Sequence, residues 1–199
     1  LKGTRDFLPS ELSKRNYIID NLKKNFQLFG FSQIETPALE KNATLLGKYG
    51  SESDRLIFKI LNSGEKLKKA DIESLQKNNL SSFSDSISEK GLRYDLTVPL
   101  ARFVAQHQND IIFPFKRFQI QNVWRADRPQ HGRFQEFTQC DADVIGSNSI
   151  IQEIELIKLY DKIFTELGFN DLVFNVNHRL ILKGLANYIG LENNLNGFI

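Results

Sequence analysis

The sequence has 199 residues, 41% of them hydrophobic and 25% charged, and a formal net charge of +2. This length suffices for one domain with a real hydrophobic core, and the small net charge excludes a global basic surface for nucleic acid, so that any such surface must be local. The single cysteine, Cys140, excludes an internal disulfide and a cysteine-based zinc site. No apolar run approaches the ~20 residues of a membrane span, and we expect a cytoplasmic protein.

The N-terminal part predicts helices alternating with short strands. After an entry loop, Ser10 can cap a helix that runs to about Leu28 with apolar residues at helical spacing, and Gly30 ends it. Further on, the pattern predicts a strand at 31–36, a short helix at 39–46 and a strand at 56–61. Residues 62–91 are rich in Lys, Ser, Asn and Glu, and we expect a polar excursion with one short helix.

The middle of the chain returns to ordered elements and leads into a hairpin. Residues 92–95 predict a strand, and Thr97 with Pro99 predicts the start of a helix. Two strand-like runs within residues 114–146 flank a loop rich in Arg, Pro and Gly. After them we expect a helix at 147–168, a strand at 172–177 and a helix at 178–190. Adjacent hairpin strands with segregated helices predict an α+β fold with an antiparallel sheet.

The 114–146 hairpin has an uneven distribution of charge. Arginines lie near its tip and carboxylates along its second strand. This polarity suits a ligand with a polyanionic end and a cationic or hydrogen-bond-donating end, as ATP and an amino acid together have. Strand alternation predicts one ligand-facing row, with the opposite side assigned to Glu136 and Asp141. The expected row consists of Arg133, Phe137, Gln139 and Asp143.

Four segments carry a family resemblance: KGTRDFLP (2–9), GFSQIETPALE (30–40), RYDLTVPLARFVA (93–105) and WRADRPQHGRFQEFTQCDADVIG (124–146). In this order and spacing they resemble class II aminoacyl-tRNA synthetases and, within them, the histidyl-tRNA synthetase family. The second segment is similar to motif 1, and residues 114–146 are similar to motif 2. The resemblance implies a six- or seven-stranded antiparallel sheet flanked by helices, and a homodimer formed through the motif 1 region.

The implied activity has two steps. L-histidine and ATP, which carries Mg²⁺, give histidyl-adenylate and pyrophosphate, and the histidyl group then moves to tRNA(His). The family's later catalytic arginine, motif 3 and anticodon-binding domain do not follow Ile199. We therefore expect an N-terminal catalytic-domain fragment, truncated before motif 3 and inactive alone. Its residues 1–176 would belong to the catalytic domain, and 177–199 would lead into an inserted domain.

The resemblance also assigns site residues. Arg125 is implied as the catalytic residue, which contacts the α-phosphate and the amino-acid carboxylate. The ATP-binding set comprises Arg125, Asp127, Arg133 and Phe137. The histidine-binding set comprises Asp95, Thr97, Arg125, Gln139 and Asp143. The loop that faces tRNA contains Arg128, Gln130 and His131. No metal site made of protein ligands is visible, and Gln135 departs from the arginine usual in the family.

Simpler interpretations stay open for these residues. Arg125 can form a surface salt bridge, Asp95 and Thr97 can cap a helix, and Phe137 can be a core residue. Asp127 can cap a loop, and the loop residues can be merely solvated. A different function is also open, since a synthetase-like paralogue serves as the regulatory subunit of ATP phosphoribosyltransferase in histidine biosynthesis.

Overall fold

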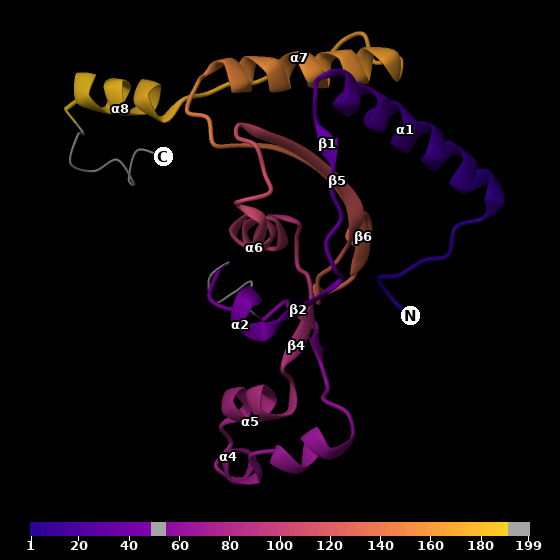
Figure 1. The fold of residues 1–199 in the computed structure, drawn as a ribbon, viewed down its shortest axis with the longest axis vertical. Coiled ribbons are helices and arrows are strands. Elements are labelled where there is room, and N and C mark those ends of the chain that lie inside the picture. Colours follow the sequence, from indigo (N-terminus) through magenta and orange to yellow (C-terminus); the bar gives the residue numbers. More distant parts are fainter. Residues whose placement is uncertain (49–54, 191–199) are drawn as a thin grey trace.

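A long hairpin is the central element of the computed structural model, which describes residues 1–48 and 55–190. Strands β5 (Phe115–Trp124) and β6 (Glu136–Ile145) pair antiparallel over ten consecutive residue pairs. The short strand β1 (Ser32–Gln33) joins β5 in parallel and completes a three-stranded sheet. Figure 1 shows the curved hairpin between α1 and α6. The predicted hairpin is confirmed.

One face of this hairpin carries the hydrophobic core, and we call it the apolar face. Two helices, α1 (Pro9–Leu28) and α7 (Ile151–Glu166), contribute side chains to this core. The Phe26 and Phe118 rings stack with their centroids 4.8 Å apart. The buried cluster consists of Phe26, Phe31, Phe118, Leu159 and Ile163, with Ile120, Ala142 and Val144 of the hairpin packed against it. Alternate residues of β5 and β6 therefore anchor the helices.

Helix α1 confirms the N-terminal prediction except at its first residue. Its N-cap is Leu8 rather than Ser10, and the Leu8 backbone N–H donates to the Glu11 carboxylate at 2.9 Å. Pro9 occupies the first turn, where its missing N–H costs nothing. Gly30, at φ +79°, follows the helix in the left-handed conformation that favours glycine.

A second three-stranded sheet lies beyond the hairpin. Strands β2 (Leu39–Lys41), β4 (Lys90–Leu92) and β3 (Lys59–Ile60) pair antiparallel in that order. Helix α2 (Asn42–Leu45) follows β2, so the helix predicted at 39–46 forms only in its second half. The described residues thus distribute their strands over two sheets, one with a parallel pair, where the resemblance implies a single larger antiparallel sheet.

The polar excursion is more regular than its composition indicates. It forms a 3-10 helix η1 (Gly64–Lys69) and two helices, α4 (Ile72–Gln76) and α5 (Leu80–Ile87). The Asp71 side chain caps α4 by accepting from the Ser74 backbone N–H at 2.9 Å, and Asn79 caps α5 in the same way. Several polar residues that favour a loop in sequence are therefore helix caps.

The remaining helices follow the predicted order. Helix α6 (Thr97–His107) begins where Thr97 and Pro99 predict it, and α8 (Arg179–Tyr188) forms within residues 178–190. The strand predicted at 172–177 is wrong, since this segment has no pairing partner among the described residues and Val173 is 82% exposed. Of the segment expected to lead into an inserted domain, residues 191–199 lie outside the described residues.

Candidate functional site

The second face of the hairpin is polar, and the register of the strands determines its members. Directly paired residues share a face, so Arg117 joins Asp143, and Gln121 joins Gln139. We call this the polar face. Its residues are Arg117, Gln119, Gln121 and Val123 on β5, and Phe137, Gln139, Asp141 and Asp143 on β6.

The expected row requires two corrections. Asp141 lies two residues from both Gln139 and Asp143 and pairs with Gln119, so the assignment of Asp141 to the opposite side is wrong. Arg133 precedes β6 and lies at a turn, where it forms an isolated bridge with Gln130, so strand alternation does not extend to it. Phe137, Gln139 and Asp143 share a face as expected.

Arg125 directly follows β5, and both its backbone and its side chain are held in place. Its backbone N–H donates to the Gln135 carbonyl at 2.9 Å, and its Nε donates to the Tyr94 carbonyl at 3.1 Å. Its guanidinium carbon lies 4.3 Å from the Tyr94 ring centroid and 5.2 Å from that of Phe137. Arg125 is half-buried and forms no ion pair within the described ranges. This geometry gives the hairpin a fixed cation beside an aromatic face.

Asp127 and Arg133 meet across the base of the hairpin loop. The Arg133 Nε lies 3.6 Å from the Asp127 carboxylate, whose side chain is 13% exposed against 58% for Arg133. The pair brings together two members of the predicted ATP-binding set. It also gives Asp127 a partner within the chain, which the resemblance does not imply.

Asp95 and Thr97 lie where α6 begins. The Asp95 carboxylate accepts from the Thr97 backbone N–H at 3.1 Å and from that of Val98 at 3.3 Å, so the helix-capping interpretation of Asp95 is confirmed. Desolvation is the main cause of the lowered pKa of Arg117 and of the raised pKa of Asp141, and the Asp95 charge makes a smaller contribution at both groups. A helix cap and a position beside the polar face are therefore compatible for this carboxylate.

Gln139 has an unpaired buried atom. Its Oε1 is buried and accepts no hydrogen bond from any residue in 1–48 or 55–190. A buried carbonyl oxygen without a donor is costly, at about 1–3 kcal/mol. The side chain lies between Phe137 and Asp141 on the polar face, which makes it a suitable acceptor for a ligand N–H group.

Asp143 forms an ion pair with the fully buried guanidinium of Arg117, its partner across the strands. The Asp143 side chain itself is 43% exposed. It therefore has one oxygen directed toward a buried cation and enough accessible surface for a further hydrogen bond. Among polar groups, a carboxylate is suited to accept from an imidazole N–H.

The hairpin loop is open to solvent. Arg128, Gln130 and His131 are exposed, and Gly132 turns the chain at φ +75°. Backbone bonds between Gln130 and Arg133 close the tip, with the Arg133 N–H donating at 2.9 Å. The loop thus presents cationic and polar side chains without burying them.

Sequence reasoning missed structural roles for Gln135 and Arg117. The Gln135 side chain donates to the Asp127 carbonyl at 2.9 Å. It also packs so closely against Gly3, which has a φ of +83°, that a larger residue there would collide with it. Nothing in a lone Gln indicates this contact. The position of Arg117 beside Asp143 could have been inferred from the hairpin register, in which the two residues pair directly.

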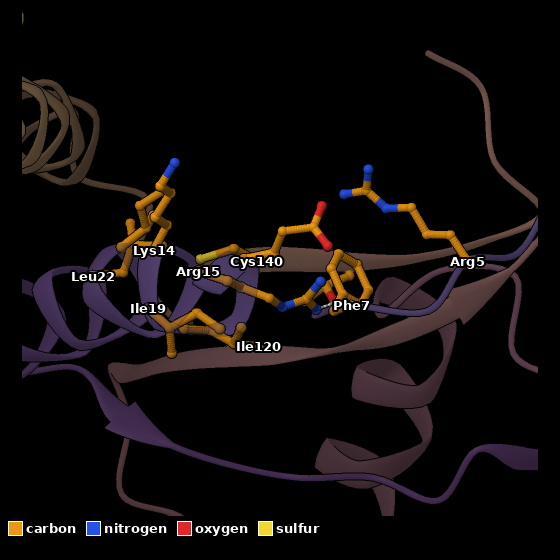
Figure 2. A pocket seen from close by; sticks show the side chains of 11 residues that line it. Arg5, Phe7, Lys14, Arg15, Ile19, Leu22, Ile120 and Cys140 are labelled. Carbon is orange, nitrogen blue, oxygen red and sulfur yellow. Dashed lines mark hydrogen bonds between the residues drawn. The ribbon is translucent and has the colours of Figure 1, made fainter. Parts of the chain in front are cut away.

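A separate pocket of about 530 Å³ lies on the apolar side of the hairpin, against α1. Figure 2 shows Arg15 and Ile19 of α1 facing Ile120 and Cys140 across it. Cys140 is an exposed residue, so the structure does not make it a core packing residue. Desolvation within the pocket and the nearby Asp141 raise the pKa of its thiol to about 11, which disfavours a reactive thiolate at neutral pH. The pocket contains none of the predicted ATP- or histidine-binding residues.

Comparison with known proteins identifies related sequences. A family model described as histidyl-tRNA synthetase matches residues 65–198. A histidine–tRNA ligase from Christiangramia forsetii is 59% identical over 99% of this chain, and one from Flavobacterium johnsoniae is 56% identical over 99%. The chain spans only 43% and 45% of the lengths of these two relatives.

Solved structures have the same fold. A histidyl-tRNA synthetase from Nostoc sp. PCC 7120 superposes with a TM-score of 0.68 at 25% identity, over 100% of this chain and 47% of its own. A Bacillus halodurans protein described as an ATP phosphoribosyltransferase regulatory subunit/histidyl-tRNA synthetase gives a TM-score of 0.65 at 26% identity, over 85% of this chain and 38% of its own. The class II synthetase-like α+β fold is thereby confirmed.

Proposed function

This chain belongs to the histidyl-tRNA synthetase family, and from that premise we propose that the full-length protein activates L-histidine with ATP and transfers the histidyl group to tRNA(His). The observation that carries the proposal is the arrangement of the polar face. A fixed cation and an aromatic ring, Arg125 and Phe137, lie at one end, and the carboxylate of Asp143 lies at the other. This order matches an adenylate with an imidazole at its far end.

ATP is proposed to bind at the loop end of the hairpin. Phe137 stacks on adenine, Asp127 receives the adenine amino group, and Arg133 meets the terminal phosphate. The last two roles require Arg133 to turn away from Asp127, which its 58% exposed side chain permits. Mg²⁺ would arrive with ATP and be held largely by phosphates and water.

Histidine is proposed to bind along the rest of the polar face. Asp95, Thr97 and Gln139 surround the α-ammonium, and the unpaired Gln139 Oε1 supports this role because it lacks a donor among the described residues. Asp143 accepts from the imidazole. This acceptor supplies discrimination, because the side chains of other amino acids would leave the Asp143 carboxylate without that hydrogen bond.

Catalysis is proposed to depend on positioning and charge. The histidine carboxylate attacks the α-phosphorus, the bond to pyrophosphate breaks, and no covalent enzyme intermediate forms. Two anions must approach, and negative charge grows on the phosphoryl oxygens, so a fixed cation stabilises the transition state. Arg125 fits this role because the Tyr94 carbonyl and two aromatic rings hold its guanidinium in place.

Two proposals concern partners. The exposed loop with Arg128, Gln130 and His131 would face the acceptor end of tRNA(His), where cationic and polar side chains suit phosphate contacts. Residues 30–40, the motif 1 region, would form a homodimer interface.

Among the helices of the described residues, none could span a membrane.

One observation supports the regulatory function as an alternative. This observation is the similarity to the Bacillus halodurans protein, whose description names both functions. A regulator that senses histidine would need the acidic end of the polar face but not the nucleotide end. The presence of Arg125, Asp127, Arg133 and Phe137 together therefore favours the synthetase.

Charging of tRNA tests the proposal. The full-length protein should attach labelled histidine to tRNA(His) in the presence of ATP and Mg²⁺ and leave a non-cognate tRNA uncharged. The Arg125→Ala variant provides the matched inactive control. Stimulation of ATP phosphoribosyltransferase, without any charging by the wild-type protein, would instead establish the regulatory alternative.

A further inference from the structure

Arg117 is a buried cation for which the proposed reaction has no assigned role. It is the third residue of β5, and its side chain is 0% exposed. Removing a guanidinium from water is costly unless other groups compensate its charge and satisfy its donors. Desolvation lowers the Arg117 pKa, while Asp143, Asp141 and Asp95 act in the opposite direction. The carboxylates of the polar face are therefore what keeps this cation in place.

The contacts of Arg117 are unequal. Its Nη2 forms an ion pair with Asp143, and its Nη1 donates to the Gln119 Oε1 at 3.4 Å. Neither Nε nor Nη2 has a hydrogen-bond partner within the described part of the chain. Asp141 contributes through the local field. Asp143 is therefore the carboxylate whose position depends most directly on this guanidinium.

The two aspartates of β6 lie close to the same cation, Arg117. Asp141 and Asp143 are next neighbours on the same face, so their negative charges repel each other. Burial raises the Asp141 pKa and Asp143 raises it further, whereas Arg117 lowers it. Without Arg117, this repulsion would lack a compensating cation, and the Asp143 carboxylate would lose the ion pair that fixes its orientation. This loss would alter the acceptor that Asp143 offers to a ligand.

We propose that Arg117 is a positioning residue for the side chain of histidine, because its buried guanidinium pairs with the Asp143 carboxylate and fixes its orientation. This inference rests on the proposed function, in which Asp143 accepts from the imidazole. Arg117 acts through Asp143 and does not touch the reacting atoms. It therefore determines how well histidine is bound and selected, and leaves the nucleotide end of the polar face unaffected.

The test is a comparison of Michaelis constants in the full-length protein. Arg117→Lys keeps the buried charge but loses the planar fork of donors that fixes a carboxylate. It should raise the KM for histidine about 10-fold or more in pyrophosphate exchange, as expected when a charged hydrogen-bond acceptor is misplaced. The KM for ATP should stay within about twofold. Arg117→Met should have a larger effect of the same kind.

The matched control is Arg102→Met. Arg102 forms an ion pair with the buried Glu40 at 2.7 Å, away from the polar face. This variant loses an arginine from another largely buried ion pair, in which Arg102 is 23% exposed and Glu40 is 5% exposed, so it reports the general cost of such a loss. The KM for histidine should stay at its wild-type value in the Arg102 variant even where its melting temperature falls.

Three outcomes are distinguishable. A selective rise in the histidine KM for Arg117→Lys supports the positioning role. An unchanged histidine KM, or an equal rise in the ATP KM, would overturn it and leave Arg117 as a structural residue of the hairpin, as would failure of the lysine variant to fold. Inactivity of the wild-type protein with histidine would instead reject the proposed function itself.

Discussion

The two faces of the β5–β6 hairpin have opposite surroundings although the same two strands build them. Phe118 and Ile120 on the apolar face pack with residues of α1 and α7 in the hydrophobic core. Arg117, Asp141 and Asp143 on the polar face form a charged group in which one guanidinium is fully buried. Neighbouring residues in the sequence thus belong to different environments, because side chains alternate along a strand.

We expect the apolar face to determine the stability of the fold and the polar face to determine ligand binding. The apolar face contributes burial, which stabilises the fold without regard to a ligand. The polar face carries costs, including the buried Gln139 Oε1 that no described residue satisfies. A buried acceptor without a donor calls for an explanation, and for Gln139 we propose a ligand N–H group. Substitutions on the two faces should therefore produce different kinds of defect.

Phe118→Ala should give the largest effect, and it should be a loss of stability. Phe118 is 0% exposed and stacks on Phe26. We expect the free energy of unfolding to fall by about 3–5 kcal/mol, because the change leaves a cavity in the core. Denaturant unfolding of the full-length protein measures this. A change in the histidine KM with unaltered stability would contradict the separation of the faces.

Arg125→Ala should instead act on the rate. Loss of a fixed cation at the reacting phosphate should lower kcat for pyrophosphate exchange by about 100- to 1000-fold. The melting temperature should change little, because the side chain is only half-buried. Steady-state kinetics and thermal unfolding on the same preparation provide the check, with Arg128→Ala in the exposed loop as the control. Wild-type kcat in the Arg125 variant would exclude its catalytic assignment.

Asp143→Asn should alter substrate recognition. The amide keeps the size of the side chain but loses the charge that pairs with Arg117. The histidine KM should rise about 10-fold or more while the ATP KM is retained. Glu136→Gln makes the same change on the other side of β6, where Glu136 accepts from the Asn122 amide at 2.9 Å, and should leave the histidine KM unaltered. An equal rise in the histidine KM for Asp143→Asn and Glu136→Gln would show that histidine binding does not depend specifically on the polar face.

The smallest effect is expected at Glu166, which joins α7 to α1. Hydrogen bonds from Asn25 and from Lys162 lower its pKa from 4.5 to about 2. Because this pKa is lower in the folded than in the unfolded protein, the ionised Glu166 carboxylate stabilises the fold above pH 4.5. This stabilisation is lost as the pH falls toward 2. Glu166→Gln should therefore lower the melting temperature slightly at neutral pH and converge with wild type in acid. Glu153→Gln, an exposed site on the same helix, is the control; a constant gap between Glu166→Gln and wild type at all pH values would be inconsistent with this linkage.

The sequence predicted the elements with strong local signals. The hairpin and the long helices α1 and α7 follow from alternation and helical spacing, which directly encode the buried face. The 172–177 segment, LVFNVN, is also rich in residues that favour strands but has no partner strand in the part of the chain that the structure describes. Pairing depends on distant residues, and a local pattern cannot contain that information.

The candidate site was predicted in part. Motif residues such as Phe137, Gln139 and Asp143 do share a face, whereas Asp141 was assigned to the wrong side although the period of the strand places it with them. The buried Arg117 was missed for a physical reason. Exposure of an arginine is the usual expectation, and only the strand register reveals that carboxylates surround this one.

The most direct test of the central claim is ATP–pyrophosphate exchange by the full-length protein, with each of the standard amino acids supplied in turn. Exchange should occur with histidine and with no other amino acid, because the acidic end of the polar face would be satisfied only by the imidazole. A folded protein that exchanges with none of them, or that responds equally to several, would contradict the assignment of the polar face as a histidine-activating site.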